Sequence, residues 1–294
     1  MENGLHKIEN EKMSVTVNEY GAQMWSVKGV DGVEYLWQGD PAYWSDRAIS
    51  IFPYVARLTE GSYSMDGKVY QMGIHGFAAG SRFAVAKQES DCLVLELEDS
   101  EETYTQYPRH FLLRHIYRLK ENTLEISFEV ENRDAKKMYF GIGGHPGFNV
   151  PLAEGKKFED YQLRFGAACT PVKVEFSEDC FVTGQETPFE LEEGKILKLQ
   201  HNLFDHDAIV LKGMDSTVTL ECEDDSHKVT VSYPQMPYLG FWHMPKTDAP
   251  YVCIEPWCSL PAKKDQITVF EEQEDLICVE PGECYKNIWT ITIA

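Results

Sequence analysis

Three short stretches of the sequence surround chemically active side chains with glycine, proline and apolar residues. The first runs "IFPYVARLTEG" and, after a turn, "GIHGFA", and it contains Arg57 and His75. The second is "GIGGHPGFN", in which His145 stands between a glycine and a proline. The third is "CIEPWCSLP", which holds Glu255 inside an apolar run and Trp257 two residues later. Two imidazoles, a guanidinium and a carboxylate can together perform acid–base chemistry and hold hydroxyl groups.

Each of these side chains also has a purely structural interpretation. A histidine between glycines often bonds loop backbone, and Arg57 can pair with a surface carboxylate. Glu255 is harder to explain in this way, because "YVCIEPW" otherwise reads as a buried strand and an unpaired buried carboxylate costs several kcal/mol. We therefore expect Glu255 to be paired or functional. We expect the glycines around His145 to form a loop that lets a ligand approach the backbone.

The sequence lacks the motifs of nucleophilic and nucleotide chemistry. It contains no G-x-S-x-G, no glycine-rich phosphate loop and no cysteine in a histidine-paired motif. The chemistry that these residues can still perform is proton transfer between a general acid and a general base. Phe77, Trp242 and Trp257 could stack on the C–H faces of a sugar ring, although core packing is the more common role of any one aromatic residue.

The net charge restricts the partners that the chain can have. Its 48 acidic residues outnumber 27 basic ones, which gives a formal charge of −21, and no basic run is present. Such a field repels nucleic acid and anionic membranes. A neutral small molecule is the partner that fits this charge best.

The cysteines and the N-terminus indicate the compartment. The eight cysteines are scattered without a C-x-x-C pair, and "MENGLHKIENEKMSV" has no apolar leader region. We therefore expect free thiols in a cytoplasmic protein. No metal-ligand spacing is present, and we expect no cofactor.

Alternating apolar and polar residues predict the architecture. The stretches "TLEISFEVE", "CLVLELE" and "KVTVSY" alternate with the period of half-buried antiparallel strands, and "YKNIWTITIA" reads as a last strand. Asp66-Gly67 predicts a tight hairpin turn, and "SEETYTQYP" predicts one short helix that Ser100 caps and that stops near Pro108. We detect no linker or repeat. The prediction is one all-β domain over residues 1–294, built of two packed antiparallel sheets.

The quoted stretches, together with "GIGGHPGFNVPL", "LFDHDAIVL" and "VCIEPWCSLP", resemble the aldose 1-epimerases, or mutarotases, and within them a LacX-like bacterial branch. The resemblance covers residues from about Tyr20 to the C-terminus in consistent order. It implies the large antiparallel β-sandwich of the galactose mutarotase-like type.

The resemblance also implies roles for single residues. Glu255 would be the general base that takes the proton of the anomeric hydroxyl, and His145 the general acid that protonates the ring oxygen. His75, Arg57 and Asp207 would hold the sugar hydroxyls. No metal, nucleotide or covalent intermediate is required by this mechanism.

One departure from the family pattern bears on the substrate. Relatives in this branch often read "HGFAR", whereas this chain has Ala79 in place of the arginine and an arginine only at position 82. Related hexose-6-phosphate 1-epimerases use arginines in this region to hold the phosphate. We therefore expect a free aldohexose as substrate, with a hexose 6-phosphate as the alternative.

Two hypotheses from different classes of protein compete with an epimerase. A non-catalytic carbohydrate-binding β-sandwich would keep the fold, but loss of Glu255 or His145 would be its signature and both are present. A cupin-like metal enzyme could use His75, His145, His243 and Glu255, but the H-x-H spacing of such sites is missing. A monomer is the default expectation, and a dimer is possible.

Overall fold

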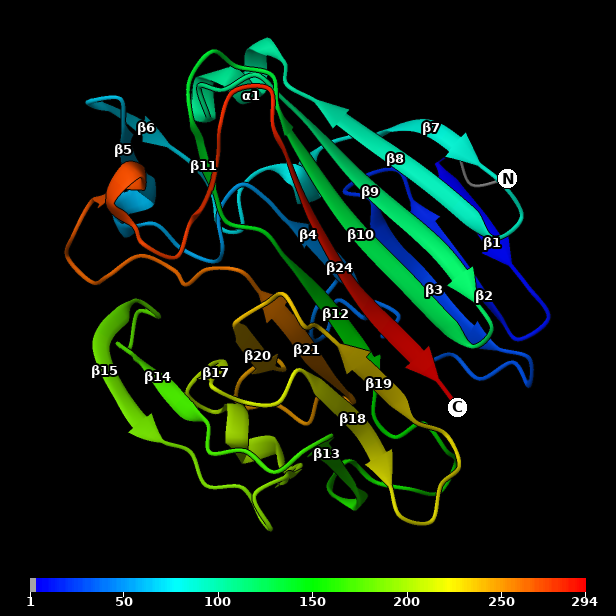
Figure 1. Ribbon diagram of the computed structural model, residues 1–294. Helices are drawn as coiled ribbons and strands as arrows, with labels where there is room; N and C mark the ends of the chain where they lie inside the picture. Colours follow the sequence, from blue (N-terminus) through cyan, green and yellow to red (C-terminus); the bar gives the residue numbers. More distant parts are fainter. Residues whose placement is uncertain (1–3) are drawn as a thin grey trace.

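The computed structural model describes residues 4–294 and contains two large antiparallel sheets with three smaller ones (Figure 1). The nine-stranded sheet has the order β16 (Ile196–Lys198), β13 (Tyr161–Phe165), β18 (Thr217–Cys222), β19 (Val229–Ser232), β24 (Cys284–Ile293), β10 (Thr123–Asn132), β9 (Phe111–Lys120), β8 (Cys92–Glu98) and β7 (Ala84–Gln88). The seven-stranded sheet has the order β15 (Val182–Pro188), β14 (Val172–Phe176), β17 (Ile209–Lys212), β20 (Tyr238–Trp242), β21 (Tyr251–Trp257), β12 (Gly143–Asn149) and β4 (Ala48–Ile51). The all-β prediction is confirmed.

Smaller sheets and single helical turns complete the fold. The small sheets are β1 (Leu5–Glu9), β2 (Met13–Asn18) and β3 (Gln23–Gly29); β22 (Thr268–Val269), β5 (Ser62–Met65) and β6 (Lys68–Gln71); and β11 (Met138–Phe140) with β23 (Ile277–Val279). Single turns of 3₁₀-helix occur at Thr59–Gly61, Ala78–Gly80, Phe158–Asp160, His201–Phe204 and Phe270–Glu272. The one α-helix within residues 4–294 is α1 (Glu101–Gln106).

The local signals of the sequence have the expected outcomes. Asp66 and Gly67 both have positive φ angles, of 51° and 70°, in the turn between β5 and β6. The Ser100 hydroxyl accepts the backbone N–H of Thr103 at the start of α1, as the capping prediction requires. Along β10 the residues alternate strictly between buried and partly exposed, which is the pattern of a strand with one face on the core.

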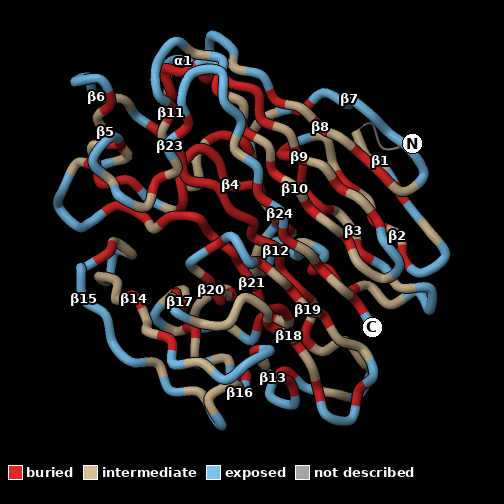
Figure 2. The backbone as a smooth tube through the Cα atoms, viewed as in Figure 1, coloured by how far each residue is buried: buried red, intermediate tan, exposed pale blue. Residues whose placement is uncertain are grey.

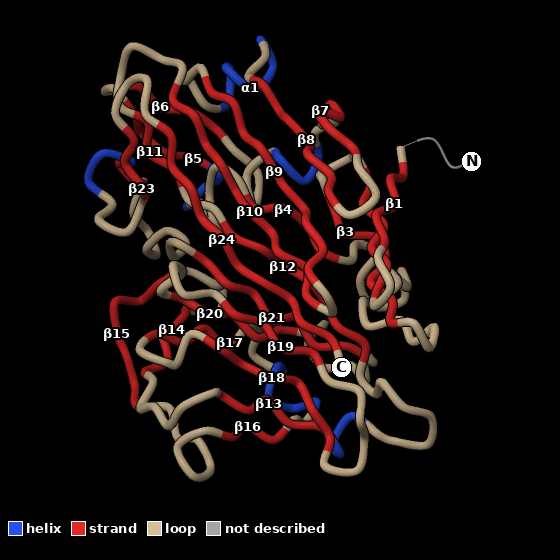
Figure 3. Tube along the Cα trace, turned by 45° about the vertical axis from the view of Figure 1, so that its right-hand side comes forward, coloured by secondary structure: helices blue, strands red, loops and turns tan. Residues whose placement is uncertain are grey.

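The neighbouring strands β21 and β12 of the seven-stranded sheet differ from β10, because they are buried on both faces. All residues of β21 are buried, as are all but the last of β12 (Figure 2). One face of β12 packs on the nine-stranded sheet through Trp289 of β24. Both views show β12 and β21 side by side in the middle of the molecule (Figures 1 and 3). A pair of strands buried in this way provides a rigid platform for the side chains on its other face.

Two further features concern the cysteines and the helices. All eight cysteines are free, as expected. Among the described residues, no helix combines the length and the apolar character needed to cross a bilayer.

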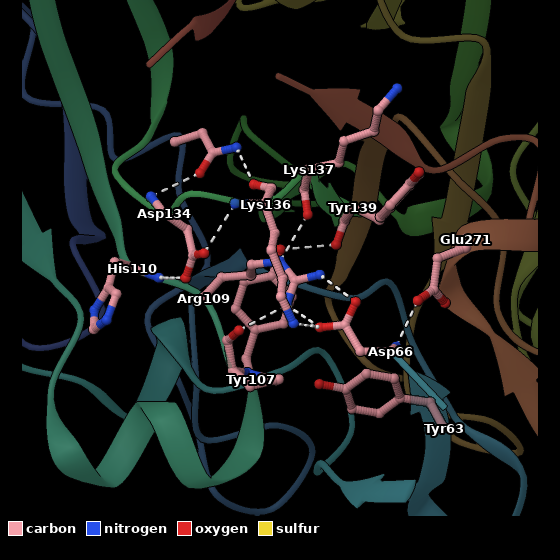
Figure 4. Close-up of polar contacts among 12 residues, drawn as sticks. Tyr63, Asp66, Tyr107, Arg109, His110, Asp134, Lys136, Lys137, Tyr139 and Glu271 are labelled. Atoms are coloured by element: carbon pink, nitrogen blue, oxygen red, sulfur yellow. Dashed lines mark hydrogen bonds and ion pairs between the residues drawn. The ribbon is translucent and has the colours of Figure 1, made fainter. Parts of the chain in front are cut away.

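A buried arginine ties the β5–β6 hairpin to the rest of the protein (Figure 4). Arg109 is only 2% exposed, and its two terminal nitrogens donate to the carboxylate of Asp66 at 2.9 and 3.3 Å. Its Nε donates to the Lys137 carbonyl at 2.7 Å, and Lys136 adds a second cation to Asp66 at 2.9 Å. The turn that the sequence predicts locally is thus held by a contact between residues far apart in the chain.

We expect Asp66→Asn to lower the free energy of unfolding by about 1–3 kcal/mol, because the buried guanidinium loses its charged acceptor. Asparagine tolerates the positive φ at this position, so the turn itself is preserved. Chemical denaturation measures the change. The control is Glu9→Gln, since both members of the Lys7–Glu9 pair are more than half exposed and the substitution should cost little. Equal stability of the two variants would contradict the proposed role of Arg109.

Candidate functional site

His145 and Glu255 face each other across two neighbouring strands. The antiparallel register of β12 and β21 runs from Gly143 opposite Trp257 to Gly147 opposite Cys253, which sets His145 opposite Glu255. Opposite residues of an antiparallel pair project from the same face of the sheet. The His145 Nε2 and the Glu255 Oε2 are 3.2 Å apart. Two residues separated by more than a hundred positions therefore form one buried polar pair.

The glycine-rich stretch that carries His145 forms an interior strand, β12, so the prediction of a loop is wrong. Its glycines are required by protein packing rather than by the approach of a ligand. A Cβ atom on Gly144 would lie 2.6 Å from the Trp289 ring, and one on Gly143 would lie 2.8 Å from the Trp257 ring. A Cβ on Gly147 would lie 3.1 Å from the Cβ of Trp37 and 3.2 Å from the Trp44 ring. Three indoles thus lie against β12 where any other residue would push the strand away.

Burial shifts both members of the pair toward their neutral forms. Glu255 is 1% exposed, and desolvation, with the nearby charge of Asp207, raises the pKa of its carboxyl well above the ordinary value. His145 is 8% exposed, and desolvation, with the neighbouring His75, lowers the pKa of its imidazole well below the ordinary value. Because the two pKa values shift in opposite directions, the pair favours the state in which the carboxyl is protonated and the imidazole is neutral.

His75 stands beside this pair in a defined tautomeric state. The backbone N–H of Ala56 donates to His75 Nδ1 at 3.2 Å, so Nδ1 is the acceptor and Nε2 carries the ring proton. The pKa of His75 is lowered to about 4, mainly because the ring is removed from water and also because of the charge of Arg57. The ring centroid lies 5.4 Å from that of His145. His75 is therefore a neutral hydrogen-bond donor near pH 7.

Asp207 is held as an acceptor by its own neighbours. The Cys180 thiol donates to Asp207 Oδ2 at 3.1 Å, and the Ala208 backbone N–H donates to Oδ1 at 2.8 Å. Burial, with the adjacent carboxylate, raises the pKa of Cys180 to about 11, so the thiol stays protonated and continues to donate. Both contacts leave further lone pairs of the carboxylate free to accept from a ligand.

These side chains line one cavity of about 310 Å³. Its polar lining includes the carboxylates of Asp46, Asp207 and Glu255, and Arg57 is the one lysine or arginine among the described residues that line it. Its aromatic lining includes Trp44, Phe176, Trp242 and Trp257. A volume of this size, with aromatic walls and a few polar groups, suits a small polar ligand.

Unusual backbone conformations are concentrated around this cavity. Four of its lining residues other than glycine have positive φ angles: Ala56 at 52°, His75 at 61°, Cys180 at 64° and Asp207 at 75°. Such conformations cost free energy and persist where the surrounding structure holds them, which is frequent at functional sites. The fold thus maintains a strained lining at this cavity.

The cavity includes most of the residues singled out from the sequence. Arg57, His75, His145, Asp207, Trp242, Glu255 and Trp257 all line it. Phe77 does not, because its ring is buried against Phe52 and Phe111 in the core. His243 is also outside the cavity lining and bonds His201 and the Met244 carbonyl, so the four-residue cupin-like set is not assembled.

Sequence reasoning missed Trp44, Asp46 and Cys180. The Trp44 ring lies 4.9 Å from the imidazole of His145 and 5.7 Å from the Trp242 ring, so it forms a wall of the cavity. It lies on an irregular segment before β4, where no periodic pattern distinguishes it. The only signal was its residue type, which is shared by five other tryptophans.

One group of side chains could hold a metal ion. Ligand atoms of His145, Cys253 and Glu255 lie within 4.8 Å of one another, and all three residues are buried. Cys253 is two residues before Glu255 in β21, so the two side chains project from the same face of the strand.

The comparisons with known proteins agree on one family. The sequence model described as Aldose 1-epimerase matches residues 4–292. The chromosomally encoded LacX protein of Lactococcus lactis subsp. lactis is 32% identical over 297 residues, which cover 98% of each chain. The crystal structure of a galactose mutarotase related enzyme from Lactobacillus acidophilus superposes with a TM-score of 0.94 at 31% identity and covers 99% of this chain and 97% of that one. A galactose mutarotase-like protein from Lactobacillus casei gives 0.93 at 27% identity, with 99% and 100% covered.

We expect Gly144→Ala to destabilise the protein by about 1–3 kcal/mol, because the added methyl group overlaps the Trp289 ring in a filled core. Thermal or chemical unfolding measures the loss. Gly80→Ala is the matched control, since a Cβ there meets no atom within 4 Å and the φ angle of Gly80 is not positive. If Gly144→Ala were as stable as Gly80→Ala, the packing role assigned to this glycine would be incorrect.

Proposed function

Because the chain belongs to the aldose 1-epimerase family, we propose that it interconverts the α and β anomers of a free aldohexose by general acid–base catalysis. The observation that carries this proposal is the contact of 3.2 Å between Glu255 and His145 on the wall of a sugar-sized cavity. The anomeric hydroxyl and the ring oxygen of a pyranose are bonded to the same carbon. An acid and a base that serve both atoms must therefore lie close together.

Ring opening moves one proton to the enzyme and one to the sugar. Glu255 takes the proton of the anomeric hydroxyl, whose oxygen then forms the aldehyde as the bond between C1 and the ring oxygen breaks. His145 gives its proton to the departing ring oxygen. The aldehyde rotates about the C1–C2 bond, and ring closure on its other face returns both protons.

The pKa shifts of the pair favour the products of ring opening over the reactive state. Ring opening ends with a protonated Glu255 and a neutral His145, which is the state that burial favours. The reactive state, with Glu255 charged and His145 protonated, contains the same number of protons. The enzyme can therefore pass between the two states without exchanging a proton with solvent.

The other lining residues suit the recognition of a sugar. His75 can donate from Nε2, Asp207 can accept, and Arg57 can donate to hydroxyl oxygens. Trp44, Trp242 and Trp257 offer apolar ring faces to the C–H groups of the sugar. We leave Phe77 out of the proposed sugar contacts because of its burial in the core.

The proposed mechanism predicts which substitutions lower the rate of catalysis. Glu255→Gln and His145→Ala should each lower the rate of anomer exchange by at least about a hundredfold, the lower end of what a positioned acid or base contributes. Glutamine keeps the shape of Glu255 but cannot take a proton. The double variant should lose far less than the product of the single losses, because the two residues act as a unit. Polarimetry or NMR exchange spectroscopy measures these rates.

The matched control for this experiment is Glu221→Gln. Glu221 is a largely buried strand carboxylate, paired with Arg164 and Lys228 on the nine-stranded sheet and remote from the cavity lining. This variant should keep wild-type activity. A folded Glu255→Gln variant with the activity of the Glu221→Gln control would end the assignment of Glu255 as the base.

The composition of the cavity predicts which sugars are preferred as substrates. Glucose and galactose should be processed with a higher kcat/KM than their 6-phosphates, because three carboxylates and a single arginine line the cavity. Arg82 does not replace the arginine missing at Ala79: its side chain is 74% exposed, pairs with Glu19 and lies in a separate surface hollow. A clear preference for glucose 6-phosphate over glucose would instead favour the phosphate-specific alternative.

A further inference from the structure

The catalytic pair has a third neighbour whose chemistry the epimerase mechanism does not use. Cys253 is 0% exposed, and its Sγ belongs to the group of ligand atoms of His145 and Glu255 that lie within 4.8 Å of one another. Its pairing partner on β12 is Gly147, which has no side chain. Trp37 and Trp44 occupy the space above Gly147, and the thiol remains within 4.8 Å of the imidazole.

The separations of these atoms are close to those around a tetrahedral ion. A zinc ion bound to nitrogen, oxygen and sulfur at its usual bond lengths holds its ligand atoms about 3.3–3.6 Å apart. The Nε2 of His145 and the Oε2 of Glu255 are already 3.2 Å apart. An approach of about 1.5 Å or less by the sulfur, from within the 4.8 Å limit, completes three corners of such a site.

The ligand types select the ion. Imidazole and thiolate are ligands for zinc and related soft or borderline cations, whereas magnesium and calcium prefer oxygen ligands alone. The cavity gives access to solvent, and the carboxylates of Asp46 and Asp207 on its lining favour the entry of a cation.

We propose that the protein binds one zinc ion between His145, Cys253 and Glu255, and that this ion is an inhibitor of the sugar site. Binding replaces the hydrogen of the Cys253 thiol by a zinc–sulfur bond and releases the proton to solvent, without any change of oxidation state. Water from the cavity fills the fourth position. The bound ion coordinates both the acid and the base, so zinc and sugar cannot be bound at this site at the same time. The inhibition rests on the proposed epimerase function, whereas the binding does not.

Direct binding is the first test. Serine replaces the exposed Cys278 and Cys284 in every protein compared, so that surface thiols do not compete. Titration calorimetry with zinc chloride should give one ion per chain, and magnesium chloride should give no binding. Cobalt(II) in place of zinc should produce the near-ultraviolet charge-transfer band of a cobalt–thiolate bond.

Removal of the thiol should abolish this site selectively. In Cys253→Ala the cobalt–thiolate band should disappear and zinc affinity should fall at least about tenfold, since even groups outside the coordination shell are worth that much. Cys92→Ala is the matched control, because Cys92 is equally buried but lies in β8 of the other large sheet. If Cys253→Ala does not fold, Cys253→Val supplies a side chain of similar size without a ligand atom.

Competition with sugar is the second test. Zinc should raise the apparent KM of the wild-type protein without lowering kcat, and this effect should be much weaker in the Cys253→Ala variant. Unchanged zinc affinity in the variant, or no binding to the wild-type protein, would overturn the proposal. A protein that binds zinc through Cys253 but never exchanges anomers would refute the proposed function and leave the metal site standing.

Discussion

The contact between the Glu255 carboxyl and the His145 imidazole is the interaction around which the site is organised. A carboxyl group that is almost fully buried is tolerable only when it is neutral or paired, and His145 provides the partner at 3.2 Å. The same desolvation moves the two pKa values in opposite directions. A structural requirement, the compensation of a buried charge, therefore yields an acid and a base that share one proton.

The geometry of this pair depends on how β12 packs. The strand lies between β21 and the edge strand β4 of the seven-stranded sheet, and its glycines allow indole rings from two sheets to approach its backbone closely. Trp289 belongs to β24, so the packing that joins the two large sheets also fixes the strand that carries the imidazole. A close-packed core transmits small displacements, and a bulkier residue here would shift His145 as well as loosen the core.

Around this rigid pair, the ligand-facing groups come from strained loops. Ala56, His75, Cys180 and Asp207 all have positive φ angles, and each is restrained by a backbone or side-chain hydrogen bond. The result is a lining whose donors and acceptors are oriented before any ligand arrives, which reduces the entropy lost on binding. The cavity is also strongly acidic, with Arg57 as its one lysine or arginine among the described residues. This composition suits a neutral ligand and also attracts cations.

The sequence alone determined the elements that depend on neighbouring residues. Alternation along Thr123–Asn132, the Asp66-Gly67 turn and the Ser100 cap follow from local sterics and hydrogen bonding, and all three occur as predicted. The sequence also singled out Glu255 as a side chain that must be paired or functional, because a carboxylate is unusual inside an apolar run. Only the tertiary structure decided that "GIGGHPGFN" is a buried strand, since three of its four glycines are explained by tryptophans up to 145 positions away in the chain. The register of β12 against β21 likewise brings Cys253 to His145, and packing against Phe52 and Phe111 leaves Phe77 in the core. These contacts depend on packing between distant parts of the chain, which the spacing of residues along the sequence does not reveal.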